Sequence, residues 1–407
     1  MKSNYRNIGD FIKLVDERNK GLKVTNLVGL SISKQFIKSV ANIIGTDMEN
    51  YKIIRKNQFA CSTMQVRRDK KMPLALFNDS EPAIISQAYP VFEINDTSQL
   101  LPEYLMMWFT RSEFDREACF HAVGGVRGSL EWEDFCGMQL PIPSIEKQQE
   151  IVKEYHIIQN RIALNNQLIS KLEKTAQAIY KQWFVDFEFP DENGLPYKSN
   201  GGVMVWCEEL VKEIPKGWRV AFLDNECYKL YGYPFDSNLF SSISENNIPL
   251  IRIRDILNGY SDVYTSEDVD SKYLLENGDL LIGMDGTFHM SIWYNGNAYL
   301  NQRVVRFKTL SNKLTNLQVL YSIKQQIIDF ENNIHGTTVA HLSDKHIKEI
   351  TFLVGEERVQ KLVTPLFSNL TKNMINKKQE TQKLEELKEL LLARMTRVDS
   401  ELETVKI

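Results

Sequence analysis

The chain has 407 residues, of which 43% are hydrophobic and 25% are charged, and its formal net charge is -4. That length predicts two to four domains, each able to bury its own core. No apolar run approaches the ~18 residues of a membrane-spanning helix, which excludes a membrane protein, and the first residues lack the apolar core of a signal peptide. Five scattered cysteines without a C-x-x-C pair argue against a disulfide framework or a structural zinc site and favour the cytoplasm.

The first globular segment, residues 1–145, has a mixed α/β pattern. Apolar or alternating runs typical of strands lie at 51–55, 59–64 and 83–86, and a short helix is expected at 101–109.

Two loops of this segment carry candidate DNA contacts. Arg67, Arg68, Lys70 and Lys71 follow an apolar strand, so their long side chains could reach phosphates or a guanine edge; an ordinary solvated loop is the alternative. A glycine loop at 124–129 presents Arg127 and Ser129, although a tight turn alone would also explain the glycines.

A long helix is predicted over residues 146–188. Its seam positions step by four and three residues, which is the 3.5-residue period of a coiled coil. All but one of them are apolar or aromatic, and they are Ile151, Tyr155, Ile158, Ile162, Asn165, Ile169, Leu172, Ala176, Ile179 and Trp183. From Ile151 to Trp183 such a helix spans about 48 Å. Asn165 is a polar seam position that can fix register. Trp183, Phe184 and Phe187 form either a packed helix end or a docking patch for a partner subunit.

A turn-rich linker, 189–205, leads into a second globular segment, 206–357, and a second long helix, 358–400. Strands are expected at 249–254, 279–283 and 304–307, with a helix at 316–330.

Five further candidates for DNA contact lie in this second segment. Arg252 and Arg254 alternate with isoleucines, so both should face one side of a strand, toward DNA or in a salt-bridged surface. Gln302 and Arg303 follow a predicted loop and could read bases. Gln87 is the first-segment counterpart of Gln302. His289 has either a structural or a functional role.

The two halves read as a duplication. With an offset of 212 residues, identical residues include Leu130/Leu342, Gln148/Gln360 and the tripeptides at 171–173 and 383–385. The same offset places Thr337 and Thr338 in the loop equivalent to that of Arg127. Two such helices most simply pair with each other, antiparallel; packing against their own domains, or against helices of another protein, is the alternative.

Several ordered motifs resemble Type I restriction–modification specificity (S) subunits. They are the segment at 139–152 (QLPIPSIEKQQEIV), the central segments 178–188, 194–202 and 214–218, and the second-segment motifs at 232–237, 249–256 and 300–304. The resemblance implies two target-recognition domains separated by a pair of long antiparallel coiled-coil helices, with pseudo-twofold symmetry.

In function, the resemblance implies a non-catalytic reader of double-stranded DNA. Each domain would read one half of a bipartite site, and the helices would set the spacer and dock two modification subunits, with a restriction/translocase subunit joining them. S-adenosylmethionine, ATP and Mg would bind the partners, and this chain would hold no cofactor.

The charge distribution and the absence of catalytic motifs bear on these expectations. Residues 1–145 have a net charge of +1 and residues 206–357 a net charge of -7, so the chain alone should bind DNA weakly. No Asn-Pro-Pro-Phe/Tyr methylation motif and no phosphate-binding G-x-x-x-x-G-K-S/T loop occurs, which argues against an enzyme. A coiled-coil scaffold without DNA readout remains the alternative.

Overall fold

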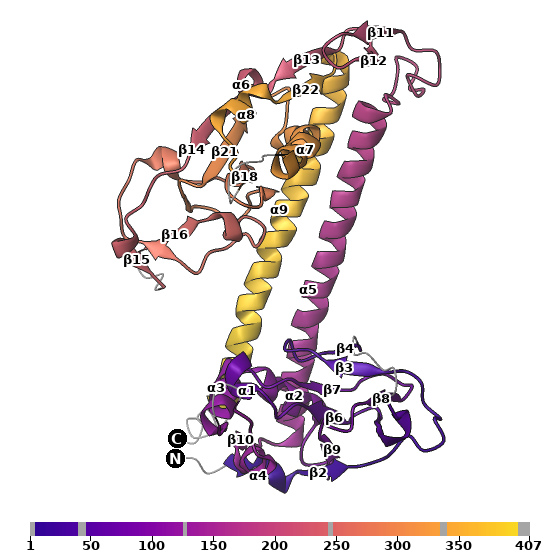
Figure 1. The fold of residues 1–407 in the computed structure, drawn as a ribbon, viewed down its shortest axis with the longest axis vertical. Helices are drawn as coiled ribbons and strands as arrows, with labels where there is room; N and C mark the ends of the chain where they lie inside the picture. Colours follow the sequence, from indigo (N-terminus) through magenta and orange to yellow (C-terminus); the bar gives the residue numbers. More distant parts are fainter. Residues whose placement is uncertain (1–4, 40–45, 125–127, 243–246, 334–339, 398–407) are drawn as a thin grey trace, which may run out of the picture. The chain divides into compact units, whose positions relative to one another are not determined.

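The computed structural model describes residues 5–39, 46–124, 128–242, 247–333 and 340–397 (Figure 1). The chain divides into two compact units, residues 1–161 with 384–407 and residues 162–383. Both units contain strands and helices, and each includes parts of the two long helices. Among the described helices, none has the length and apolar character needed to cross a membrane.

Short strands and helices build the first unit before the long helix α5. In chain order they are β1 (Tyr5–Asn7), η1 (Ile8–Asp10), β2 (Ile12–Val15), β3 (Val28–Leu30), β4 (Phe36–Lys38), η2 (Met48–Asn50), β5 (Lys52–Ile54), β6 (Phe59–Cys61), α1 (Val66–Asp69), β7 (Leu74–Leu76), β8 (Ala83–Ile85), β9 (Val91–Ile94), α2 (Pro102–Thr110), α3 (Ser112–His121), α4 (Trp132–Gly137), β10 (Gln139–Pro141) and α5 (Ile145–Tyr180).

The central sheet of the first unit has four strands in the order β2-β9-β6-β7, all antiparallel. Its core is aromatic: Phe59 and Phe92 stack with their ring centroids 5.0 Å apart, and Phe109 and Phe135 pack against Phe92. Burying several such rings supplies much of the hydrophobic stabilisation of the unit.

The second unit contains the end of α5, a continuing π-turn η3 (Lys181–Val185), and the start of α9. Its other elements are β11 (Met204–Cys207), β12 (Lys212–Pro215), β13 (Arg219–Phe222), α6 (Leu223–Glu226), β14 (Cys227–Tyr231), η4 (Ser237–Leu239), β15 (Phe240–Ser241), β16 (Ile248–Ile251), η5 (Ile253–Asp255), β17 (Tyr264–Thr265), η6 (Ser271–Tyr273), β18 (Leu280–Gly283), β19 (Met290–Ile292), β20 (Tyr299–Leu300), β21 (Val304–Thr309), α7 (Asn316–Asn333), α8 (Asp344–Glu349) and β22 (Thr351–Val354). Helix α9 (Glu357–Arg394) begins in this unit and ends in the first unit, which also contains η7 (Met395–Arg397).

The central sheet of the second unit repeats that of the first. Its order is β14-β21-β18-β19, so each strand has a counterpart in β2-β9-β6-β7 and is met in the same sequence along the chain. The flanking pairs repeat as well, because β13 pairs with β22 as β1 pairs with β10. The shared topology supports the duplication inferred from the 212-residue offset.

The long helices α5 and α9 pack together, and their pairing is antiparallel within each unit (Figure 1). In the first unit, Ile151 and Tyr155 near the start of α5 share a core with Leu392 from the end of α9. In the second unit, Ala176 near the end of α5 shares a core with Phe367 near the start of α9. The mixed α/β fold with two β-rich domains and packed long helices is therefore confirmed.

The seam predicted from the 3.5-residue period is the inward face of α5. Every seam position from Ile151 to Trp183 is buried or half-buried. Asn165 is fully buried, and neither polar atom of its side chain has a hydrogen-bond partner among the described residues. Pro365 lies inside α9.

Two local expectations were wrong. The strand predicted at 249–254 ends at Ile251, and Ile253–Asp255 form the 3-10 helix η5, because the Asp255 carboxylate accepts from the backbone N–H of Arg252 and closes a helical turn. The segment containing Arg67 and Arg68 is not a plain loop but includes the helical turn α1.

Candidate nucleic-acid interface

Three loops of the first unit meet at one edge of its central sheet. The chain leaving β6 lies beside the chain entering β9, since the Cys61 N–H donates to the Pro90 carbonyl at 3.1 Å. The glycine loop lies next to the chain leaving β6, because the Leu130 N–H donates to the Thr63 carbonyl at 2.9 Å. This edge therefore collects the β6–β7 connection, the turn before β9 and the glycine loop.

Exposed cations line the β6–β7 connection at this edge. Arg67, Arg68, Lys70 and Lys71 are all exposed. Arg67 Nη1 donates to the Gly124 carbonyl at 3.0 Å, and its side chain packs on Gly128, so Arg67 braces the glycine loop. Arg68 forms two hydrogen bonds with its neighbour Asp69, which lowers the pKa of that carboxyl group. Lys70 and Lys71 have no ion-pair partner among the described residues, so their charges are available to an anion such as a phosphate.

The other first-unit candidates divide between this edge and the undescribed segment. Gln87 is exposed in the turn between β8 and β9. Ser129 is half-buried and closes the glycine loop through paired backbone hydrogen bonds with Val123. Arg127 lies outside the described residues.

The same edge of the second unit gathers three equivalent loops. The Met284 N–H after β18 donates to the Arg303 carbonyl before β21 at 3.0 Å. The third loop is joined by the Leu342 N–H, which donates to the Met284 carbonyl at 2.8 Å, and by the Gly286 N–H, which donates to the Ala340 carbonyl at 2.9 Å. Leu342 and Leu130 are related by the 212-residue offset, so the two units close this edge in the same way.

A triad of polar side chains, Asp285, Arg303 and His341, lies where these second-unit loops meet. Arg303 Nη1 is 3.0 Å from Asp285 Oδ2, and His341 Nδ1 is 2.6 Å from Asp285 Oδ1. The side chains of Arg303 and His341 are 58% and 47% exposed, whereas that of Asp285 is 25% exposed. The carboxylate thus sits beneath two exposed groups and holds both.

The remaining second-unit candidates differ in their freedom to contact DNA. Gln302 is exposed beside Arg303, and His289 is half-buried in the β18–β19 connection. Arg252 is held by Asp255 and Asp262, its Nη2 lying 2.6 Å from Asp262 Oδ1, as in the salt-bridged alternative, whereas Arg254 is exposed. Thr337 and Thr338 lie outside the described residues.

The aromatic residues that follow α5 mostly pack into the core of the second unit. Phe184 and Phe187 are only 3% and 4% exposed and both contact the Trp218 ring. Trp183 is half-buried against the same core. The two phenylalanines therefore offer a partner little surface.

An apolar groove on the paired helices of the first unit exposes more apolar surface than Phe184 and Phe187 do. It has a volume of about 290 Å³ and is lined mainly by leucine and isoleucine, together with Glu154 and Arg394. Ile157, Leu387 and Leu390 are 59%, 49% and 61% exposed, respectively. Exposed apolar side chains gathered in this way mark interaction surfaces.

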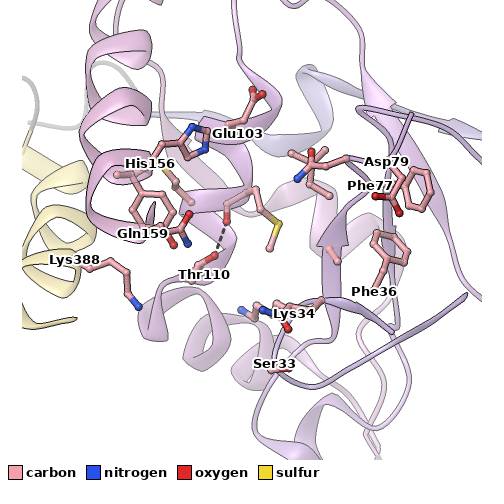
Figure 2. Close-up of a pocket in the computed structure, with 17 residues that line it drawn as sticks. Ser33, Lys34, Phe36, Phe77, Asp79, Glu103, Thr110, His156, Gln159 and Lys388 are labelled. Carbon is pink, nitrogen blue, oxygen red and sulfur yellow. Dashed lines mark hydrogen bonds between the residues drawn. The ribbon is translucent and has the colours of Figure 1, made fainter. Parts of the chain in front are cut away.

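A larger cavity, of about 510 Å³, lies between the strands and helices of the first unit (Figure 2). His156 and Lys388 project from the helices on one side, and Phe36 and Asp79 lie on the strand side. Lys34 enters it from the β3–β4 turn, where its ammonium is buried 2.8 Å from Asp115 Oδ1 and also donates to the Phe109 carbonyl. The cavity is thus bordered by an internal ion pair that ties the β3–β4 hairpin to α2 and α3.

Sequence reasoning missed Asp285, His341 and Lys34. Within the described chain, no group of three or more His, Cys, Asp or Glu could hold a metal ion. Asp285 lies beside the candidate His289 in a glycine-containing turn, and that turn was the available signal. Nothing in the sequence around Lys34 indicates burial.

Comparisons with known proteins identify the family. The family description "Type I restriction modification DNA specificity domain" matches residues 74–174 and 215–386. The chain is 27% identical over 203 residues to the Type I restriction enzyme EcoBI specificity subunit of Escherichia coli, a match covering 48% of this chain and 43% of that relative. It is 22% identical over 308 residues to the MjaIX specificity subunit of Methanocaldococcus jannaschii, covering 73% of this chain and 68% of the relative. The match thus spans less than half of the E. coli relative.

A solved structure shares the fold. The S subunit of a Type I restriction-modification system from M. genitalium aligns with a TM-score of 0.58 at 13% identity, covering 96% of this chain and 95% of that one. The duplicated sheets, the packed long helices and the family match agree with one another. The chain therefore belongs to the Type I restriction–modification specificity subunit family, whose members are DNA specificity subunits, not enzymes, and carry no cofactor of their own.

Proposed function

We propose that each unit of this chain reads one half of a bipartite double-stranded DNA site, for methylation and restriction carried out by other subunits. The observation that carries the proposal is the repeated loop edge: two sheets of the same order bring three loops each to the same edge, with exposed polar and cationic side chains on them. Loops held on a rigid sheet are the usual place for recognition residues.

The proposed contacts in the first unit are Arg67, Arg68, Lys70, Lys71, Gln87, Arg127 and Ser129. Those in the second unit are Gln302, Arg303, His289, Thr337, Thr338, Arg254 and Arg252, the last limited by its two carboxylate partners. Cations would position the phosphates, whereas arginine and glutamine can also read base edges in the major groove.

A domain exchange tests this proposal. Residues 1–145 are replaced by the equivalent part of a relative, the chain is expressed with its modification subunit, and the methylated sequences are read across the genome. A reader should change one half of the methylated site and keep the other half. A scaffold without DNA readout should change neither half, and that result would overturn the proposal.

The long helices would set the unread spacer between the half-sites. Helix α5 extends from Ile145 to Tyr180, which corresponds to about 54 Å at 1.5 Å per residue. Inserting one turn of about four residues into both helices would add about 6 Å, or about two base pairs. The methylated sites should then have a longer spacer and unchanged half-sites.

The modification subunits would dock on the helices and adjoining faces. The apolar groove at Ile157 and Leu390 supports this, because an amphipathic helix could bury its apolar side there. The positions one repeat away, Asn369 and Ala178, are polar or small. We therefore expect two modification subunits to bind with unequal affinity, the tighter one at the first unit.

A matched pair of substitutions tests this docking. Leu390→Asp should release one modification subunit from the complex, as measured by analytical ultracentrifugation. Leu310→Asp, a change at a leucine that is 64% exposed outside the groove, should leave the stoichiometry unchanged. Equal behaviour of the two variants would contradict the assigned docking site.

The cofactors and the location follow from this assembly. S-adenosylmethionine, ATP and Mg would bind to the modification and restriction/translocase subunits, and the complex would work in the cytoplasm. Because the second segment has a net charge of -7, the partners would supply much of the positive surface that holds DNA.

A further inference from the structure

We propose that Asp285 is a positioning residue that orients Arg303 to read a guanine in the half-site of the second unit. The proposal rests on the proposed function, since it assumes that this loop edge meets DNA. It adds the base recognised, the side chain that reads it and the residues that hold that side chain in place.

The triad is not needed to stabilise the fold. Backbone hydrogen bonds already join its three loops, through Met284 to Arg303, Leu342 to Met284 and Gly286 to Ala340. Arg303 is 58% exposed, and ion pairs at that exposure contribute little to stability. A structural role therefore does not account for an arginine held in this way.

The charge of Asp285 also indicates that it orients Arg303 and does not attract DNA. A carboxylate at a DNA-binding edge repels phosphates, and the second segment is already acidic. Asp285 is more buried than the two groups it holds, so it is set back from the surface while Arg303 projects. A carboxylate in that place opposes phosphate binding but restricts the direction of a guanidinium.

The contact with Asp285 occupies only one side of the Arg303 guanidinium. The Nη1 atom of Arg303 faces Asp285, which leaves the edge formed by Nε and Nη2 for the two acceptors O6 and N7 of guanine. A bidentate contact of this kind is the commonest specific arginine contact with DNA. Holding the side chain before binding lowers the conformational entropy lost on contact and disfavours a switch to a phosphate.

His341 completes the support from the other side. The ionised carboxylate of Asp285 only accepts hydrogen bonds, so the 2.6 Å contact places the proton on His341 Nδ1. Both carboxylate oxygens are then engaged, one by each neighbour, and Asp285 cannot rotate without breaking a contact.

The test measures base preference in the assembled complex of this chain with its modification subunit. The methylated site of the wild-type complex is first read across the genome. Methylation rates are then measured on duplexes in which each base pair of the second half-site is replaced in turn. Arg303→Ala and Arg303→Lys should lower the preference for guanine at one position by about tenfold to a hundredfold, because neither retains the bidentate fork.

The variants at Asp285 separate positioning from structure. Asp285→Ala should weaken the preference at that same position by at least severalfold while rates on the other replaced duplexes stay in their wild-type order. Asp285→Glu, which keeps a carboxylate, should restore part of the preference. Lys313→Ala is the matched control: its side chain is 59% exposed, it pairs with Glu357, and it lies beyond the opposite end of β21, so it should change no position.

Two results would overturn the proposal. One is an unchanged guanine preference in Arg303→Ala or in Asp285→Ala. The other is a uniform loss across all duplexes with a smaller salt dependence, which would make Arg303 a phosphate contact. If the domain exchange fails to change either half-site, the proposed function itself fails; if the exchange succeeds and the Arg303 variants keep the preference, only this inference fails.

Discussion

The buried pair of Lys34 and Asp115 gives the sharpest test of how the first unit is held together. Their side chains are 6% and 10% exposed, and Lys34 Nζ lies 2.8 Å from Asp115 Oδ1. The same carboxylate oxygen accepts from the Met72 N–H at 3.1 Å. Lys34 belongs to the β3–β4 turn and Asp115 to α3, so the pair joins two separate elements.

Lys34→Met should lower the free energy of unfolding of the first unit by about 3–5 kcal/mol, because it leaves the Asp115 charge buried without its partner. Asp115→Asn should cost a similar amount by stranding the ammonium. The double variant leaves no buried charge and keeps an acceptor for Met72, so it should cost less than about 2 kcal/mol. The coupling between the two sites should therefore reach about 4 kcal/mol or more.

Hydrogen exchange is the appropriate assay, because a chain with two units need not unfold in one transition. The amides of β3 and β4 should lose protection in each single variant and regain most of it in the double variant. Lys13→Met is the control, since Lys13 is 58% exposed and pairs with Glu93 on the surface, and should cost less than about 1 kcal/mol. Single-variant costs near that of the control, or additive costs in the double variant, would refute a coupled buried pair.

Three other changes test separate features. The pKa of Asp344 is held below 3.8, mainly by the hydrogen bond from Lys229, so its contribution to stability is present above that pH and is lost as the pH falls; wild type should lose more stability than Asp344→Asn between about pH 5 and pH 2 in acid denaturation. Asn165→Leu should raise the free energy of unfolding by about 1–3 kcal/mol in thermal melts, because it removes two buried unpaired polar atoms. Gly232→Ala should lower it by about 1–3 kcal/mol, because the new Cβ would lie 2.1 Å from the Asn301 carbonyl oxygen; an unchanged melting temperature would contradict this contact.

The long helices were predictable because their signal is repeated many times. Each seam position adds to one 3.5-residue period, so a single polar residue such as Asn165 does not hide it. The buried strands β6 and β18 were predictable for a related reason, since a continuous apolar run is stable only inside a core. The two-residue strands β15, β17 and β20 are too short to leave a periodic signal.

Predictions failed where a local side-chain hydrogen bond competes with the pattern. The alternation of isoleucine and arginine at 251–254 indicates a strand, but Asp255 binds the backbone and side chain of Arg252 and turns the chain. Contacts between side chains of distant loops could not be predicted from the sequence for another reason. Asp285 and His341 are 56 residues apart, and only the folded sheet brings them together.

The two units carry different side chains at the equivalent loop edge of two sheets with the same strand order. In the first unit, cations occupy the β6–β7 connection, and Arg67 braces the glycine loop. In the second unit, the equivalent β18–β19 connection carries the carboxylate of Asp285, and the cation has moved to the chain before β21. Backbone hydrogen bonds from Leu130 and from Leu342 close the edge in both units, so the side chains of these loops can differ without disturbing the sheet beneath them. Because the proposed contacts and the core are made by separate residues, the proposed function predicts that exchange of these loops alone changes one half-site.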